Sequence, residues 1–309
     1  MIYNKYDFKR KMILYSQALS KGVKMAKEII IADHAGFCFG VKRAVEIAVN
    51  QQTSDQSNTY TLGPLIHNND VINRLKEQNI LPITEAQLGE LGSKDSIVIR
   101  SHGVAPDIWE QIEKTGAQLV DATCPYVSSI QKKVRKYRDL GYQIIIVGDA
   151  KHPEVIGING WCDNSAIITK DGSDLGELPS KVCIVSQTTE RLANYDKVVE
   201  IVSRRCEDVQ TFNTICKATS DRQSSADEVS KKVDLMIVIG GKNSSNSKKL
   251  YDICSKNCKN SIFIENSKEL SADIFHENRI EKVGITAGAS TPDWVIEDVV
   301  KKSREFLAI

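Results

Sequence analysis

The stretch that decides the fold is Ile29-Ile30-Ile31-Ala32-Asp33-His34-Ala35-Gly36-Phe37-Cys38, followed at once by the helical pattern of residues 41–49. A short β-branched run of this kind has the length of a buried strand, and the apolar spacing after it is that of an amphipathic helix. Between them lies a polar, glycine-containing loop that ends in a cysteine. The stretch therefore predicts a strand over residues 28–32, a loop and a helix, the repeating unit of an α/β sheet.

The same arrangement recurs at residues 118–124 and 209–216, each of which also ends in a cysteine, at intervals of about 90 residues. Two further strand-to-loop junctions of the same kind follow each cysteine. These junctions lie at residues 63–69, 97–103, 144–154, 183–189, 235–247 and 283–291. A repeat of this length is too long for a solenoid and indicates three similar α/β domains.

We expect these domains to pack as a pseudo-threefold trefoil, so that their equivalent loops converge on one point. Ligands of open α/β sheets bind at the carboxyl ends of the strands, where each loop begins a helix. The expected boundaries are 25–124, 125–214 and 215–309, with the first strand of the first domain able to pair with the third domain. Residues 1–24 are expected to form a flexible N-terminal extension.

Composition excludes several classes of protein. The chain has 309 residues, 41% of them apolar, and a net charge of +1. A balance so near neutrality gives no electrostatic footprint for nucleic acid or an anionic membrane. No apolar run approaches the roughly 20 residues of a membrane-spanning helix. The extension is basic but lacks the apolar core and cleavage site of a signal peptide. We expect a cytoplasmic protein, with no nucleic-acid or membrane partner.

Three of the eight cysteines, Cys38, Cys124 and Cys216, end equivalent loops and should converge. There is no C-x-x-C pair, and nothing indicates secretion, so a disulfide framework and a zinc ribbon are not indicated. Three thiolates would leave a fourth position open, as in catalytic metal sites. Zinc would tolerate them, but a cubane iron–sulfur cluster fits better, since its free iron could act as a Lewis acid. The other cysteines are expected to be small buried apolar residues: Cys162, Cys183, Cys206, Cys254 and Cys258.

The remaining loops carry small, neutral hydrogen-bonding groups that suit a phosphate. Three of the five histidines lie in these loops, as do two serine-rich segments, although serine and asparagine are also ordinary helix caps. Glu154 could deliver a proton, and Thr188 could pass it on or orient a substrate hydroxyl. No P-loop or G-x-G-x-x-G is present, so a nucleotide is not indicated. The candidate phosphate-binding residues are His67, His102, His152, Ser244, Ser245, Asn246 and Ser290.

Taken together, these motifs resemble the 4-hydroxy-3-methylbut-2-enyl diphosphate reductase family, over about residues 25 to 305 and in the right order. The motifs are Gly36-Phe37-Cys38-Phe39-Gly40, Asp121-Ala122-Thr123-Cys124-Pro125, His152-Pro153-Glu154-Val155, Gln187-Thr188-Thr189, Thr214-Ile215-Cys216, Lys242-Asn243-Ser244-Ser245-Asn246-Ser247 and Thr286-Ala287-Gly288-Ala289-Ser290. A set of seven motifs is far more specific than any one of them.

The resemblance implies three α/β domains around a [4Fe–4S] cluster held by Cys38, Cys124 and Cys216. It implies an iron–sulfur oxidoreductase that completes the non-mevalonate isoprenoid pathway. Two electrons and two protons would remove the substrate hydroxyl as water at the open iron, giving isopentenyl and dimethylallyl diphosphate. A one-electron donor such as ferredoxin or flavodoxin would supply the electrons.

The resemblance also implies roles for individual residues. Glu154, Thr188 and His152 are the expected catalytic residues, with the first two handling protons. The residues expected to bind substrate are His67, His102, His152, Thr188, Ser244, Ser245, Asn246 and Ser290.

Two other functions stay open at this stage. One is a dehydrating enzyme similar to quinolinate synthase, which also uses three cysteines in a three-domain trefoil. The Ser244-Ser245-Asn246 loop and the His152-Pro153-Glu154 loop favour the reductase over it. The other is a cluster-containing sensor without turnover, but no basic recognition helix is visible in the sequence.

Overall fold

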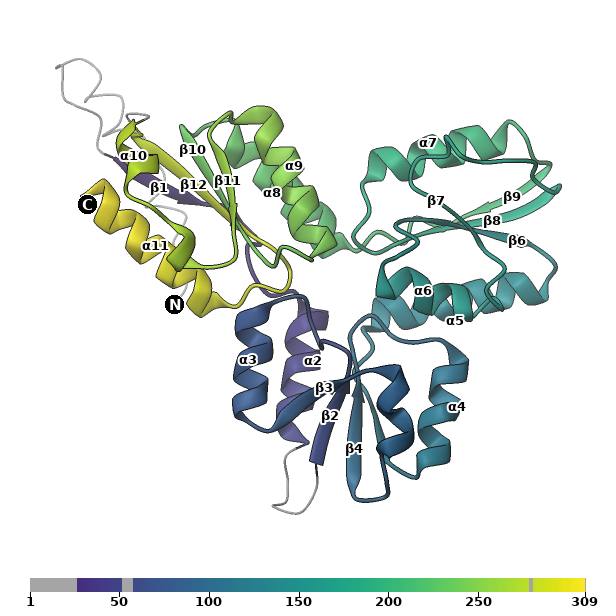
Figure 1. Cartoon of the computed structure of the whole chain (residues 1–309). Helices are drawn as coiled ribbons and strands as arrows, with labels where there is room; N and C mark the ends of the chain where they lie inside the picture. Colours follow the sequence, from purple (N-terminus) through teal and green to yellow (C-terminus); the bar gives the residue numbers. More distant parts are fainter. Residues whose placement is uncertain (1–26, 52–57, 278–279, 309) are drawn as a thin grey trace, which may run out of the picture.

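The structure is a computed structural model that describes residues 27–51, 58–277 and 280–308. It contains three four-stranded parallel sheets, each flanked by helices and each formed from a different part of the chain (Figure 1). This confirms the expected three-unit α/β fold. The extension at residues 1–24 lies outside the described residues, and the expected domain boundaries stay a prediction.

The first unit has the sheet order β3-β2-β4-β5, and its strands are short and rich in β-branched residues. Three consecutive residues at the end of β4, Ile97 to Ile99, are fully buried, as expected for a strand covered on both faces. The elements are α2 (Phe39–Asn50), β2 (Asn58–Leu62), α3 (Asn69–Glu77), β3 (Ile80–Ile83), the 3-10 helix η1 (Glu85–Glu90), β4 (Asp95–Ile99), α4 (Pro106–Thr115) and β5 (Gln118–Asp121).

The second unit repeats this plan with the sheet order β7-β6-β8-β9. Ile144 to Val147 in β6 are fully buried beneath helices on both sides. The elements are α5 (Pro125–Asp139), β6 (Gln143–Val147), α6 (Pro153–Gly160), β7 (Ile167–Thr169), β8 (Lys181–Ser186), α7 (Leu192–Ser203) and β9 (Asp208–Thr211).

The third unit has the order β1-β12-β10-β11, so the first strand of the chain, β1 (Glu28–Ile31), completes the last sheet. It pairs with β12 from Glu28 opposite Lys282 to Ile31 opposite Ile285. The other elements are α8 (Lys217–Ser230), β10 (Leu235–Ile239), α9 (Ser245–Asn257), β11 (Ser261–Ile264), the 3-10 helix η2 (Ser267–Glu269), α10 (Asp273–Glu277), β12 (Lys282–Ala287) and α11 (Asp293–Leu307).

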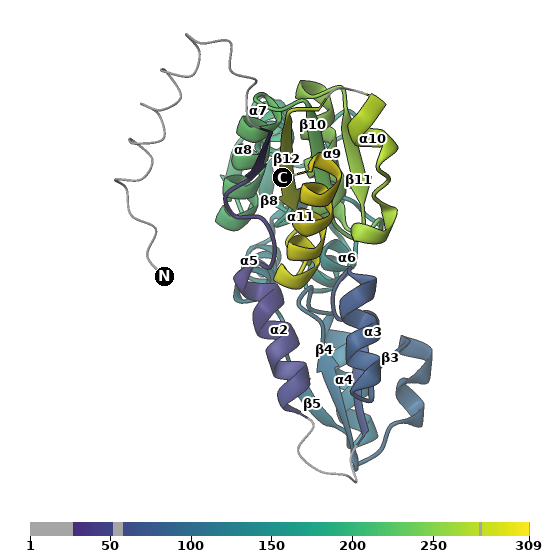
Figure 2. The same ribbon diagram turned by 90° about the vertical axis from the view of Figure 1, so that its left-hand side faces the viewer.

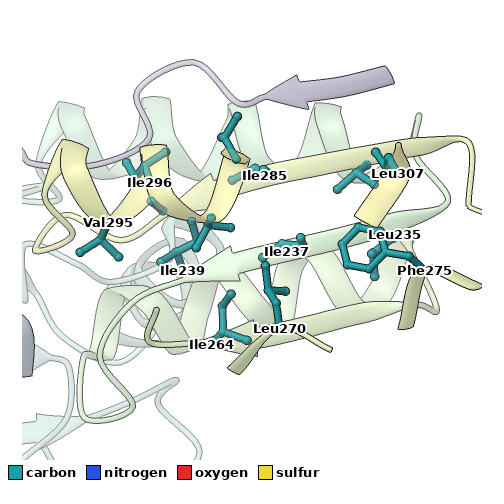
Figure 3. Close-up of a cluster of buried hydrophobic side chains, with 14 of the residues drawn as sticks. Leu235, Ile237, Ile239, Ile264, Leu270, Phe275, Ile285, Val295, Ile296 and Leu307 are labelled. Carbon is teal, nitrogen blue, oxygen red and sulfur yellow. The ribbon is translucent and has the colours of Figure 1, made fainter. Parts of the chain in front are cut away.

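Each unit has apolar clusters on both faces of its sheet. In the third unit, Ile237 and Ile239 of β10 and Ile285 of β12 pack against one side of α11 (Figure 3). The other face of that sheet packs under α8 and α9, with Met236 and Val238 buried there. These clusters hold the strands rigidly, so the loops at their carboxyl ends are well positioned.

The three units surround a common centre in which those loops meet (Figure 1). Seen from the side, α2, α5 and α8 lie along one face of the molecule, and α3, α6 and α9 lie along the opposite face (Figure 2). Within the described residues, no helix is long and apolar enough to cross a membrane.

Candidate active site

The three predicted ligand cysteines occupy the same position in each unit. Cys38, Cys124 and Cys216 are the N-cap residues of α2, α5 and α8, and none of them uses its side chain to cap the helix. Their sulfurs are therefore free to bind a ligand where three helix N-termini, with unpaired N–H groups and positive dipole ends, converge. Burial raises the pKa of the Cys124 and Cys216 thiols, while backbone N–H groups of the following helix lower it.

The cysteine loops come together because small and cationic residues join them. A Cβ on Gly40 would lie 2.6 Å from the sulfur of Cys124, so only glycine allows α2 to approach α5 this closely. The Nη1 of Arg43 donates to the carbonyl oxygen of Thr123 at 3.2 Å. The Nη2 of Arg222, in α8, donates to the carbonyl oxygen of Gly36 at 2.9 Å. The first hydrogen bond joins α2 to the loop before α5, and the second joins α8 of the third unit to the loop before α2.

The spacing of the sulfurs bears on what they could hold. Among the described residues, the only potential metal-binding group whose ligand atoms all lie within 4.8 Å of one another is a set of three histidines. The three sulfurs are therefore more widely spaced than four-coordinate zinc, with Zn–S of about 2.3 Å, would hold them. The donor set, three convergent thiols without a carboxylate or imidazole among them, fits an iron–sulfur cluster.

Three imidazoles gather beside the cysteines, one from each of three loops. The ring centroids of His67 and His102 lie 4.9 Å apart, those of His67 and His152 5.8 Å, and those of His102 and His152 5.3 Å. Burial is the main cause that lowers the pKa of each, to about 4 for His152 and well below the usual value for His102. Near neutral pH the three rings are therefore uncharged.

The hydrogen bonding of His152 decides between a metal and an anion in this cluster. As N-cap of α6, its Nδ1 accepts from the backbone N–H of Glu154 at 3.2 Å. A neutral imidazole that accepts at Nδ1 carries its proton on Nε2. Nε2 is thus a hydrogen-bond donor, which suits a phosphate oxygen and does not suit a metal ion.

Serine and asparagine side chains of the third unit complete the polar wall. Ser244 caps α9, and Ser290 donates to the carbonyl oxygen of His67 at 3.1 Å. Both amide atoms of Asn246 are buried without a hydrogen-bond partner among the described residues, as are Nε2 of His67 and Nδ1 of His102. Buried polar atoms without partners are rare, and each costs free energy, so their concentration here indicates a polar ligand.

Glu154 and Thr188 form a buried pair at the edge of the cluster. The Glu154 carboxyl accepts from the backbone N–H of Thr188 at 2.6 Å and from its hydroxyl at 2.7 Å. Glu154 is 2% exposed, and burial raises its pKa, against the opposing effect of the two hydrogen bonds. A carboxyl group with a raised pKa, joined to a hydroxyl, is suited to proton delivery.

All of the predicted site residues line one cavity, although they come from loops far apart in the sequence. They are Cys38, His67, His102, Cys124, His152, Glu154, Thr188, Cys216, Ser244, Ser245, Asn246 and Ser290. Of the other cysteines, Cys162, Cys183, Cys254 and Cys258 are buried in apolar clusters, as expected. The expectation was wrong for Cys206, which is only partly buried because it lies in the turn between α7 and β9.

Sequence reasoning missed two cations near this cavity, a buried arginine and a partly buried lysine. Arg222, which is 2% exposed, lines it beside Cys38 and Cys216. Lys249 of α9 binds Glu190 at 2.8 Å and the carbonyl oxygen of Thr189 at 3.0 Å. Both occur in polar helical segments that read as solvent-exposed, so only their position in the fold distinguishes them.

Comparisons with known proteins agree with this geometry. Residues 29–304 match the LytB protein family. A 4-hydroxy-3-methylbut-2-enyl diphosphate reductase from Clostridium perfringens strain 13 is 51% identical over 282 residues, covering 91% of this chain and all of that protein. A reductase of the same name from Clostridium acetobutylicum is 53% identical over 281 residues, 90% of this chain. This chain spans only 44% of that longer relative.

Two solved structures share the fold. One is described as (E)-4-hydroxy-3-methyl-but-2-enyl diphosphate reductase, the terminal enzyme of the non-mevalonate pathway. It is 43% identical, with a TM-score of 0.68 over 90% of this chain and 99% of that one. The other is the E-1-hydroxy-2-methyl-but-2-enyl-4-diphosphate reductase of Plasmodium falciparum. It is 27% identical, with a TM-score of 0.82 over 89% of this chain and 87% of that one.

Proposed function

Because this chain belongs to the LytB protein family, we propose that it reduces 4-hydroxy-3-methylbut-2-enyl diphosphate to isopentenyl and dimethylallyl diphosphate. Two electrons and two protons enter, the C–O bond of the allylic hydroxyl breaks, a C–H bond forms, and water leaves. The observation that carries the proposal is one cavity that joins three convergent cysteines, uncharged imidazoles and a buried carboxyl–hydroxyl pair.

Cys38, Cys124 and Cys216 would hold a [4Fe–4S] cluster, which when bound supplies the electrons and an open, Lewis-acidic iron. The thiols fit this group by their donor set and by their position at three helix N-termini, which favour an anion. Arg222 adds a buried positive charge beside two of them.

The diphosphate would be bound by neutral donors. His152 offers its Nε2 proton, and Asn246, His67 and His102 bring polar atoms that have no partner in the part of the chain that the structure describes. The N-terminus of α9 at Ser244 adds backbone N–H groups. These groups orient the substrate, so that its hydroxyl lies on the side of the cysteines.

Glu154 and Thr188 would deliver protons. The raised pKa keeps Glu154 protonated at a higher pH than an ordinary glutamic acid, and its hydrogen bond to the Thr188 hydroxyl provides a path to substrate. Protonation of the departing hydroxyl, or of the allylic carbon, would use the same pair.

The dehydrating alternative needs no external electrons, and a sensor needs no turnover. The Glu154–Thr188 pair beside the three histidines favours an enzyme over a sensor, and the reductase names of the relatives favour reduction over dehydration. A cytoplasmic location, and ferredoxin or flavodoxin as donor, stay predictions of the sequence.

The test begins with protein purified without oxygen, wild type beside Cys124→Ala. We expect the absorption and the iron and sulfide content of a [4Fe–4S] protein in the wild type, and their loss in the variant. Anaerobic incubation of the wild type with dithionite, methyl viologen and the allylic diphosphate should then yield both products. A wild type that stays colourless after reconstitution, or a loaded protein without turnover, would refute the proposal.

A further inference from the structure

The proposed reduction requires electrons from another molecule, and the described chain shows where they would enter. The sulfurs of Cys38, Cys124 and Cys216 belong to half-buried residues, so they are near the surface. Three of the loops that would bind the diphosphate, those carrying His67, His152 and Ser244, precede α3, α6 and α9, on the opposite face from α2, α5 and α8 (Figure 2). Among the described residues, these three loops leave the face of α2, α5 and α8 to a donor.

The N-terminal turns of these three helices form a continuous surface. Gly40 packs against the Cys124 side chain, which places the start of α2 beside the start of α5. Arg222 connects the first turns of α8 to the carbonyl of Gly36, two residues before Cys38. The residues at the first positions of α2, α5 and α8 therefore surround the three cysteines, and we call them the collar.

Two aromatic residues of this collar lie open to solvent next to the cysteines. Phe39, the first residue of α2, is 66% exposed, and Tyr126, the second residue of α5, is 53% exposed. A single exposed apolar residue is ordinary, but two exposed aromatic rings in the first turns of two adjoining helices are typical of an interface. Aromatic residues at an interface exclude water and bind with little loss of side-chain entropy.

The first turns of the helices that carry these rings contain no acidic residue, although the exposed Asp33 and Asp121 lie in the segments that precede α2 and α5. Acidic residues are favoured in the first turn of a helix, and α3, α4, α6 and α11 each have one there. The helices α2, α5 and α8 have none. Lys42, one turn after Phe39, and Lys217, the first residue of α8, are exposed. The acids of α2 and α8, Glu46 and Asp221, lie a further turn from the cysteines.

The buried charge of Arg222 can be explained by an anionic cluster, whose charge it would balance. That explanation does not account for the exposed lysines and aromatic rings of the collar. On a chain whose net charge is only +1, a local positive surface selects an acidic partner. We propose that Phe39, Lys42, Tyr126 and Lys217 form the docking surface for a small, acidic one-electron carrier protein. This inference rests on the proposed function: two reduced carriers each give up one electron for every substrate hydroxyl removed as water.

The experiment uses the anaerobic holoenzyme and a purified acidic ferredoxin as probe. Binding is measured by calorimetry at low and high salt, and turnover is measured with reduced ferredoxin and separately with methyl viologen, each per loaded cluster. The variants are Phe39→Ala and the double charge reversal Lys42→Glu/Lys217→Glu. The control is Lys94→Glu, an exposed lysine in the turn before β4, at the strand end away from the cavity.

We expect the charge reversal to weaken ferredoxin binding about tenfold or more, to abolish its salt dependence, and to lower the ratio of ferredoxin-driven to viologen-driven turnover. Phe39→Ala should lower the same ratio, and Lys94→Glu should not change it. Ferredoxin binding as tight and as salt-dependent as in the wild type, with an unchanged ratio in both variants, would overturn the proposal.

The design separates this inference from the proposed function. A wild type without viologen-driven turnover would disprove the proposed function, whereas the binding measurement still tests the surface. Should the charge reversal cost the cluster, Phe39→Ala and Lys42→Gln give the same comparison without placing a negative charge beside Cys216.

Discussion

At the scale of the residue, Glu154 is the side chain whose chemistry depends most on burial. Its carboxyl is enclosed by Thr188 and only 2% exposed, so its neutral form is favoured. We predict that Glu154→Gln lowers viologen-driven turnover about 10²- to 10⁴-fold, because the amide cannot donate a proton. Thr188→Ser keeps the hydroxyl and should retain most of the activity. A Gln variant as active as the wild type would exclude Glu154 as the proton donor.

Arg222 is a buried guanidinium with no carboxylate partner among the described residues. It donates to the carbonyl oxygens of Ala218 and Gly36, at 2.8 Å and 2.9 Å. Arg222→Gln should destabilise the fold by about 1–3 kcal/mol, because the buried carbonyl of Gly36 loses its donor. It should also lower the iron bound per chain.

The measurements for Arg222 are a denaturation midpoint and an iron assay. Arg222→Lys, which keeps the charge, should retain more iron than Arg222→Gln. The exposed Arg204 provides the matched control, and its change to glutamine should stay within about 0.5 kcal/mol. Equal iron content in wild type and Arg222→Gln would contradict a role for this charge.

His152 gives a prediction about pH. Its pKa is lowered from 6.5 to about 4 by burial, so the folded protein holds this ring neutral while the unfolded chain protonates it. Between pH 4 and pH 6.5 the unfolded state therefore binds more protons than the folded state. The contribution of His152 to the free energy of unfolding is complete above pH 6.5 and is lost as the pH falls toward 4. A shift of this size corresponds to about 3 kcal/mol.

Chemical denaturation of wild type and His152→Gln, at several pH values from 7 to 4.5, tests this. The variant should lose less stability on acidification, because it lacks the ring. Parallel curves for the two proteins would show that His152 does not contribute. His67 and His102, whose pKa values are lowered in the same direction, should leave a residual pH dependence in the variant.

At the scale of the element, helix α2 contains a glycine that is unfavourable for helix formation but permits a close contact with Cys124. Alanine is a better helix former than glycine by about 1 kcal/mol, yet a Cβ at Gly40 would meet the Cys124 sulfur at 2.6 Å. Gly40→Ala should therefore lower cluster content, because α2 or Cys124 must move. Gly89, in η1, has no atom within 4 Å of such a Cβ, and Gly89→Ala should leave the content unchanged. Iron and sulfide analysis of the two variants tests this prediction. A Gly40→Ala protein with as much iron and sulfide as the wild type would refute it.

At the scale of the whole molecule, a buried ion pair joins the second and third units. The Nζ of Lys249 in α9 lies 2.8 Å from Glu190, with side chains 16% and 3% exposed, and it also binds the Thr189 carbonyl. This contact fixes the loop that carries Thr188. Glu190→Gln leaves a buried ammonium without its counter-charge and should cost about 3 kcal/mol.

The double variant Glu190→Gln/Lys249→Met removes that unpaired charge and should recover part of the loss. Urea denaturation of the wild type, both single variants and the double variant gives the coupling energy. Additive single losses would mean that the pair does not link the units.

The sequence by itself determined the elements and most of the candidate site. Strands, loops and helices follow from local apolar period, and a cysteine at the same junction in each third predicted a common centre. The convergence of Cys38, Cys124 and Cys216 could be predicted without coordinates, because strand-end loops of an α/β unit face one edge of the sheet.

Only the tertiary structure decided which segments meet. Local pattern left the pairing of the first strand with the third domain as one possibility, and the fold decides it by pairing β1 with β12. It also buries Arg222 and Lys249, in helical segments whose polar composition is typical of a solvated surface. The tautomer of His152 depends on the backbone N–H of Glu154, and its lack of charge depends on burial. Charge, tautomer and burial are set by the surroundings of a group, and those surroundings come from parts of the chain distant in sequence.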